Sequence, residues 1–97
     1  MSDNVCFIIG TGRRTHVIRN MGDFRNFWNG NATGNPPEWI SVYISVTTPN
    51  GVGIEFGPRD IININMQFLN VLRNLVTRIY NSDDPYTDLR RGIEDFN

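Results

Sequence analysis

The feature that most constrains this sequence is an uninterrupted alternation of apolar and polar side chains over residues 39–47. Such alternation predicts a β-strand, because successive side chains of a strand point to opposite sides. It also predicts an antiparallel sheet with one buried and one open face. We expect Ile40, Val42, Ile44 and Val46 on the buried side, and Trp39, Ser41, Tyr43, Ser45 and Thr47 on the other.

A turn and a second strand follow directly. Residues 48–51 (TPNG) contain a proline that presets its own φ, then an asparagine and a glycine that tolerate positive φ. Residues 52–56 then alternate again, with Val52, Ile54 and Phe56 expected to point inward. These two strands form a predicted hairpin.

The first part of the chain predicts another hairpin. Residues 5–10 (VCFIIG) are apolar on both sides, which is typical of a central strand covered on both faces. Residues 10–14 form a glycine-rich turn, and 15–19 return as a strand. Asp23 is the expected N-cap of a short helix over 24–28. The loop 29–37 that follows is either a connector or a functional arm.

The second part predicts a long helix. Gly57 and Pro58 are expected to break the preceding strand. Apolar residues then recur at three- and four-residue steps, so the helix begins between Asp60 and Asn65 and ends near Tyr80. Its start is ambiguous, because residues 62–66 also alternate as a strand would, and Asn65 could instead cap a helix that begins at Met66. Asp84 followed by Pro85 can start one last short helix, since proline suits the first helical position.

The expected fold class is therefore α+β, in the order ββαββα. We expect a four-stranded antiparallel sheet with one long helix packed on one face, plus a short C-terminal helix or tail. A chain of 97 residues supports one modest core. We assign residues 1–81 to a single domain and 82–97 to an acidic tail or short helix.

The charges do not favour a polyanion as partner. All nine basic residues are arginine, yet the net charge is −1. The absence of lysine reflects either compositional drift or selection against lysine modification. Arginines and aromatic rings in the first half leave RNA or single-stranded nucleic-acid binding as an alternative, although the pI near 5.6 argues against it.

No catalytic or metal-binding set is complete in the sequence. His16 and Cys6 are single, and a buried thiol in an apolar strand is normally inert. They would approach each other only if their strands pair. The Gly10-Thr11-Gly12 segment resembles a phosphate-binding loop but lacks the third glycine and the following helix, so a hairpin turn is favoured. We expect neither enzymatic activity nor a cofactor nor a metal.

The best candidate binding residues are Trp39, Tyr43, Arg13 and Arg14. The two rings share the polar side of the predicted strand, where aromatic residues are enriched at interaction surfaces. The alternative is that a helix covers them. The two arginines lie at the turn of the first hairpin, where guanidinium groups suit anionic oxygens.

In size and layout the chain resembles immunity proteins of bacterial toxin systems and small virus-encoded antagonists of host factors. The likeness is architectural and carries no motif. It implies a non-catalytic protein-binding module, an inhibitor or an adaptor, located in the cytoplasm of a bacterial or host cell. A homodimer is also expected, because four strands leave edges to be paired or covered. No run of residues is apolar enough to span a membrane.

Overall fold

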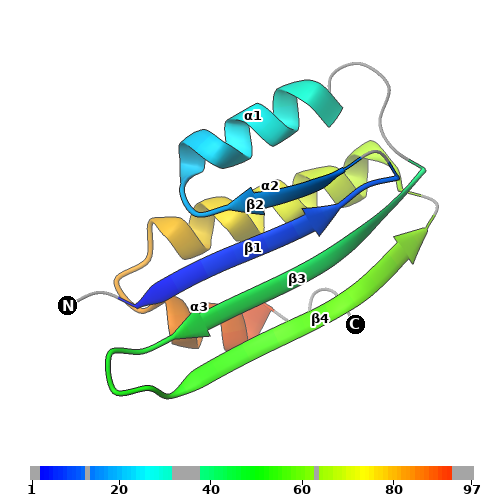
Figure 1. The fold of residues 1–97 in the computed structure, drawn as a ribbon. Helices are drawn as coiled ribbons and strands as arrows, with labels where there is room; N and C mark the ends of the chain where they lie inside the picture. The colour runs from blue at the N-terminus through cyan, green and yellow to red at the C-terminus, as the bar shows by residue number, and fades with distance from the viewer. Residues whose placement is uncertain (1–2, 13, 32–37, 63, 93–97) are drawn as a thin grey trace.

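The computed structural model describes residues 3–12, 14–31, 38–62 and 64–92, which form four strands and three helices in the order ββαββαα (Figure 1). The elements are β1 (Asn4–Gly10), β2 (Thr15–Ile18), α1 (Met21–Asn31), β3 (Trp39–Thr47), β4 (Gly53–Ile62), α2 (Met66–Tyr80) and α3 (Pro85–Gly92). The strands make one antiparallel sheet in the order β2-β1-β3-β4. The predicted α+β fold class is confirmed.

The alternation in β3 determines which face of the sheet is buried. Ile40, Val42, Ile44 and Val46 are fully buried, while the residues between them remain partly or wholly exposed. Because β3 pairs with β1 on one side and β4 on the other, its register carries the same inside and outside to its neighbours. Phe7 of β1 and Phe56 of β4, both opposite Ile44, therefore also face inward.

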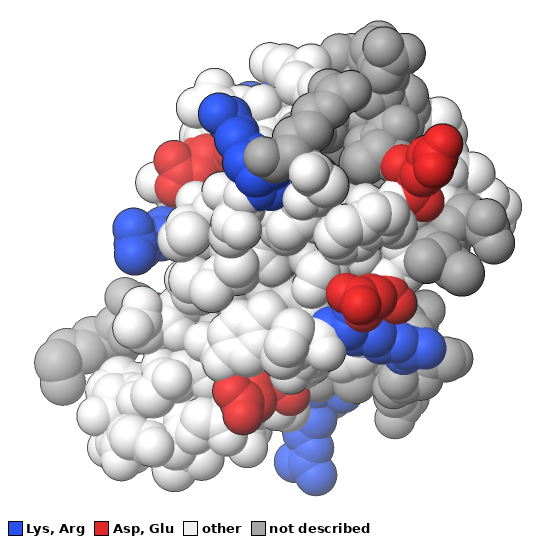
Figure 2. Space-filling model, turned by 45° about the vertical axis from the view of Figure 1, so that its right-hand side comes forward, with Lys and Arg blue, Asp and Glu red and all other residues white. Residues whose placement is uncertain are grey.

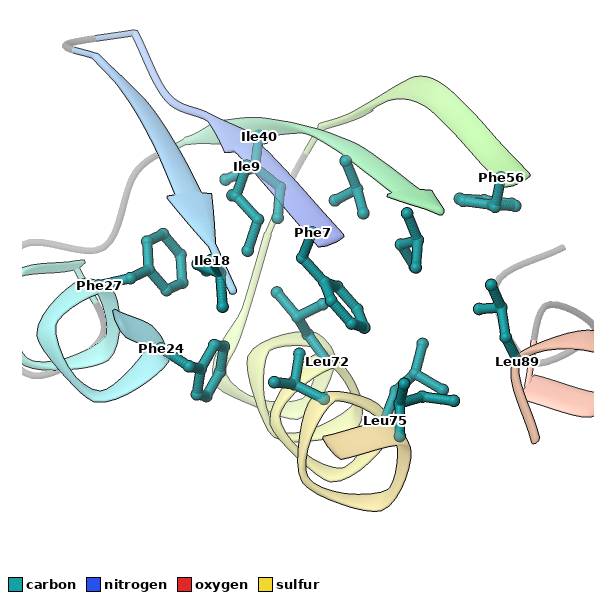
Figure 3. Packing of buried hydrophobic residues seen from close by; sticks show 14 of the residues in the cluster. Phe7, Ile9, Ile18, Phe24, Phe27, Ile40, Phe56, Leu72, Leu75 and Leu89 are labelled. Atoms are coloured by element: carbon teal, nitrogen blue, oxygen red, sulfur yellow. The ribbon is translucent and has the colours of Figure 1, made fainter. Parts of the chain in front are cut away.

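The hydrophobic core lies between the inner face of the sheet and the three helices (Figure 3). Helix α2 contributes Leu72 and Leu75, α1 contributes Phe24 and Phe27, and α3 contributes Leu89. Helix α2 is the predicted long helix, and its amphipathic stripe is the side that faces the sheet. All described helices thus lie on one side of the sheet.

Strand β4 does not end where the sequence predicted. It continues from Gly53 to Ile62, through the glycine and proline expected to break it. A register shift between Val42 and Ile44 places an extra residue in β4 at this point, which is a β-bulge. Pro58 is tolerated because β4 is an edge strand, where a missing backbone N–H removes few ladder hydrogen bonds.

Two of the three helices begin where the residues at their starts indicate, and the first does not. The Asn65 side chain accepts a hydrogen bond from the Phe68 N–H at 2.9 Å, and Asp84 caps α3 just before Pro85. Asp23 is not the cap of α1: that helix begins earlier, at Met21, and the Asn20 side chain accepts the Asp23 N–H at 2.9 Å. Both residue types cap helices well, so composition alone did not distinguish them.

Candidate functional site

One side of the sheet carries no described helix, and we call it the open face (Figure 1). Strand β1 was expected to be covered on both sides because both its sides are apolar. That expectation is wrong for its outer side, where Cys6 and Ile8 are only half-buried. The open face is formed by the outward residues Asn4, Cys6, Ile8, Gly10, Thr15, Val17, Trp39, Ser41, Tyr43, Ser45, Thr47, Gly53, Glu55 and Asp60.

An apolar row crosses the middle of the open face. Ile8 is directly opposite Val17 on one side and Tyr43 on the other, so three large side chains lie in line across three strands. Val17 is 41% exposed, and Trp39, four residues before Tyr43 on the same side of β3, is 40% exposed. The outward side of an antiparallel sheet is normally polar, so this row is an unusual, partly exposed apolar surface.

Tyr43 is held in place by a neighbour on β4. Its hydroxyl donates a hydrogen bond to Glu55 Oε2 at 2.5 Å. This bond, together with the Glu55 charge and desolvation, raises the pKa of the Tyr43 hydroxyl above its ordinary value. The hydrogen bond fixes the ring across β3 and β4 as an apolar surface with a polar rim.

Trp39 lies at the end of the sheet beside the β1–β2 turn. A Cβ atom on Gly12 would come within 4.0 Å of the indole Nε1. This is an ordinary van der Waals distance, so the indole lies beside the turn. The structure brings Trp39 and this turn together although they are far apart in the sequence.

The two predicted arginines are placed differently. Arg13 lies outside the described residues. Arg14 is exposed and lines a shallow hollow along β2 with His16, Asp23 and Phe27, so it lies at the sheet edge beside α1. This hollow is on the helix side of the sheet, and strand β1 separates β2 from the strand that carries Tyr43.

The glycine-rich segment is a hairpin turn. The Thr11 N–H donates a hydrogen bond to the Arg14 carbonyl oxygen at 2.9 Å, and a strand follows directly. A phosphate-binding loop needs the N-terminus of a helix at this position. The sequence prediction of a turn is confirmed.

Cys6 and His16 do not form a pair. Cys6 is opposite Ser45 on the open face, whereas His16 is opposite the buried Ile9 and packs edge-on against Phe27 with ring centroids 5.0 Å apart. The two side chains thus lie on opposite faces of the sheet. Burial, and then the Arg14 charge, lower the pKa of His16 below its ordinary value.

The described residues hold neither a group of three potential metal ligands nor a helix suited to crossing a membrane. Among those residues, no three His, Cys, Asp or Glu side chains are grouped closely enough to hold a metal ion. None of the described helices has the length and apolar character needed to cross a membrane.

Charged side chains lie mainly around a broad uncharged area of the surface (Figure 2). On the open face itself, the charged residues are Glu55 and Asp60, both from the edge strand β4. The opposite edge of the face is formed by β2, whose outward residues Thr15 and Val17 are uncharged. The face is thus neutral at its centre and acidic along one edge.

No protein-family model, curated protein or solved structure matches this chain. The function therefore has to be argued from the site. Sequence reasoning selected Trp39 and Tyr43 but missed Ile8 and Val17. Their signal was present, because strand 5–10 is apolar on both sides, but only the position of the helices shows which side is left open.

Proposed function

We propose that this chain is a non-catalytic protein-binding module, such as a small inhibitor, an immunity protein or a viral antagonist of a host factor. It binds its partner through the open face. The observation that carries the proposal is the partly exposed row of Val17, Ile8 and Tyr43 on a sheet whose other side holds the core. The exposed Trp39 lies on the same face, nearer the end of β3.

Burying these side chains against a partner lowers the free energy of the complex. Each large apolar group that leaves water on binding contributes about 25 cal/mol per Å² of buried surface. Tryptophan and tyrosine are also the residues most often found as energetic anchors, because they are large and lose little conformational entropy. The Tyr43–Glu55 hydrogen bond adds preorganisation, since it orders the ring before a partner arrives.

Nucleic-acid binding is the second candidate. An open four-stranded sheet with two aromatic rings is a geometry on which unpaired bases can stack. The charges oppose it, because Glu55 is bonded to one of those rings and Asp60 lies on the same face. Phosphate groups would meet two carboxylates there, so a protein partner is favoured.

The test is to identify a protein that contacts the open face and then to measure how tightly it binds. A photo-reactive amino acid at Ser41, between the two rings, would be cross-linked in cell extract, and one at the exposed Arg25 of α1 would serve as the control position. A partner captured only from Ser41 would then be purified. Its affinity would be measured by calorimetry, alongside the binding of a labelled single-stranded RNA.

We expect Trp39→Ala combined with Tyr43→Ala to keep the fold and weaken binding of that partner. Truncating anchors of this kind costs about 2 kcal/mol or more, which is roughly 30-fold in Kd. Val52→Ala is the matched control, since Val52 is 53% exposed but lies in the β3–β4 turn. Unchanged affinity in the double variant, or tight RNA binding that salt abolishes, would count against the proposal.

A further inference from the structure

We infer that the first residues of β1 bind the carboxyl terminus of an extended peptide, which adds to the sheet as a short strand. The site lies at the edge of the sheet, at the point where β2 ends. It is separate from the open face and therefore goes beyond the proposed function. Its ligand is a peptide with a free terminal carboxylate.

The edge of β1 is only partly used by β2. Positions 7–10 of β1 pair with β2, whereas positions 4–6 pair with β3 alone, so β1 extends past the end of β2 (Figure 1). The Thr11 N–H donates a hydrogen bond to the Arg14 carbonyl oxygen across the hairpin. Backbone groups alternate between the two neighbours of a strand. Every second residue before Thr11, down to Val5, therefore directs its N–H and C=O toward the β2 side.

Val5 thus presents one backbone donor and one backbone acceptor at the edge that β2 does not reach. Among the described residues, neither group has a hydrogen-bond partner. Val5 is half-buried, and backbone polar groups removed from water are nearly always paired. An extended segment beside β1 supplies both partners, as in other cases of strand addition to a sheet edge.

A hollow with a volume of about 540 Å³ lies next to this edge. It is lined by the start of β1, by the end of α2 and by the segment that joins α2 to α3. Arg19, the residue directly after β2, lines it as well. Three residues of a strand extend about 10 Å, so the hollow accommodates a chain end of a few residues.

The charge of Arg19 selects the end of the peptide and its direction. Strand β2 occupies the edge from Phe7 onward, so an added segment has to end or turn away beside Arg19. The exposed Arg19 guanidinium forms no ion pair within the part of the chain that the structure describes. A terminal carboxylate is stabilised by this group, whereas a terminal amine meets a like charge. The peptide therefore ends beside Arg19 and runs parallel to β1.

The other charges of the hollow select one side chain of the peptide. The peptide residue beside Val5 has its side chain on the same side of the sheet, toward the helices and the hollow. Asp3 and Asp83 supply the carboxylates there. Asp3 also accepts a hydrogen bond from the Tyr86 N–H at 3.4 Å, which holds it at the hollow. A basic residue is therefore favoured at the position before the last.

The experiment is fluorescence polarisation with a labelled pentapeptide, Gly-Ser-Val-Arg-Val, that has a free carboxyl terminus. We expect saturable binding, and about tenfold weaker binding of the same peptide with a C-terminal amide, because the amide removes the charge that Arg19 binds. Arg19→Gln should abolish this preference for the free carboxylate. Arg25→Gln, at an exposed position of α1, is the matched control and should retain it. Circular dichroism would verify that both variants are folded.

Methyl groups on the peptide nitrogens test the strand pairing directly. In a parallel pair, Val5 donates to the residue before its neighbour and accepts from the N–H of the residue after it. N-methylation of the last peptide nitrogen should therefore lower the affinity about tenfold. N-methylation of the arginine nitrogen, which points away from β1, should change it little. Peptide binding should also protect the Val5 amide from hydrogen exchange.

No binding at millimolar peptide would overturn the inference, and so would equal binding of the free acid and the amide. Equal effects of the two N-methyl groups would likewise overturn it. These outcomes are separable from failure of the proposed function, because Trp39→Ala combined with Tyr43→Ala changes only the open face. That double variant should bind the pentapeptide as the wild type does, and loss of binding would contradict a separate site.

Discussion

Single hydrogen bonds fix how the helix layer meets the sheet. The Tyr80 hydroxyl, at the end of α2, donates to the Ile18 carbonyl oxygen at 2.6 Å, across 62 positions of sequence. Its ring packs against Phe7 with centroids 5.7 Å apart. Burial raises the pKa of this hydroxyl well above its ordinary value.

Tyr80→Phe should therefore lower the free energy of unfolding by about 1 kcal/mol, because it leaves a carbonyl oxygen without its partner. The pH dependence has a definite sign. A raised pKa in the folded protein means that the hydroxyl stabilises the fold below its ordinary value of 10.0 and loses that contribution as the pH rises further. Urea unfolding of the wild type and of Tyr80→Phe at neutral and alkaline pH measures this change in stability.

In that comparison, the wild type should lose more stability than Tyr80→Phe as the pH rises above 10.0. A Tyr80→Phe protein with the alkaline stability loss of the wild type would contradict this account.

At the scale of elements, the bulge in β4 is the feature with the strictest local requirement. Gly57 has φ +86, a left-handed conformation that other residues adopt only with strain. A Cβ atom there would also come within 2.2 Å of the Val42 carbonyl oxygen on β3. The strand can continue past the glycine only because no side chain is present.

Gly57→Ala should destabilise the protein by about 2 kcal/mol or more, because it adds backbone strain and a clash with β3. Gly51→Ala is the control: Gly51 has nearly the same φ, +85, but nothing lies within 4 Å of its Cβ position. It should cost about 1 kcal/mol. Chemical denaturation of both variants gives the difference, and equal losses would mean that the close approach to Val42 is unimportant.

At the scale of the whole molecule, α3 belongs to the same core as the sheet. Leu89 is fully buried and lies in the cluster that contains Phe56 and Val76. The Leu89 side chain points from α3 into that cluster (Figure 3). Helix α3 therefore covers a part of the inner face of the sheet that α2 does not cover.

Leu89→Ala should lower the stability of the whole fold by about 2–4 kcal/mol, because it leaves a cavity in the shared core. The transition should remain a single one by circular dichroism and by tryptophan fluorescence, since no part of the core unfolds separately. Arg90→Ala, one position further and exposed, should change little. A variant whose sheet and α2 keep wild-type stability would show that α3 is an independent appendage.

The sequence by itself determined the fold class. Side-chain alternation in residues 39–47 and the helical stripe of residues 66–80 are local patterns, and each has one regular structure that places its apolar side chains together. The cap at Asn65 and the helix start at Asp84 and Pro85 could be predicted for the same reason, because a helix start depends on residues within one turn.

Only the tertiary structure determined which apolar side chains remain exposed to solvent. Ile8 and Phe7 are equally apolar neighbours in one strand, yet Phe7 is buried and Ile8 is half-exposed. The difference arises because all described helices pack on the same side of the sheet, and that choice depends on contacts between distant segments. The bulge at Gly57 has the same origin, since the close approach of Val42 is a property of the paired strands and of neither sequence alone.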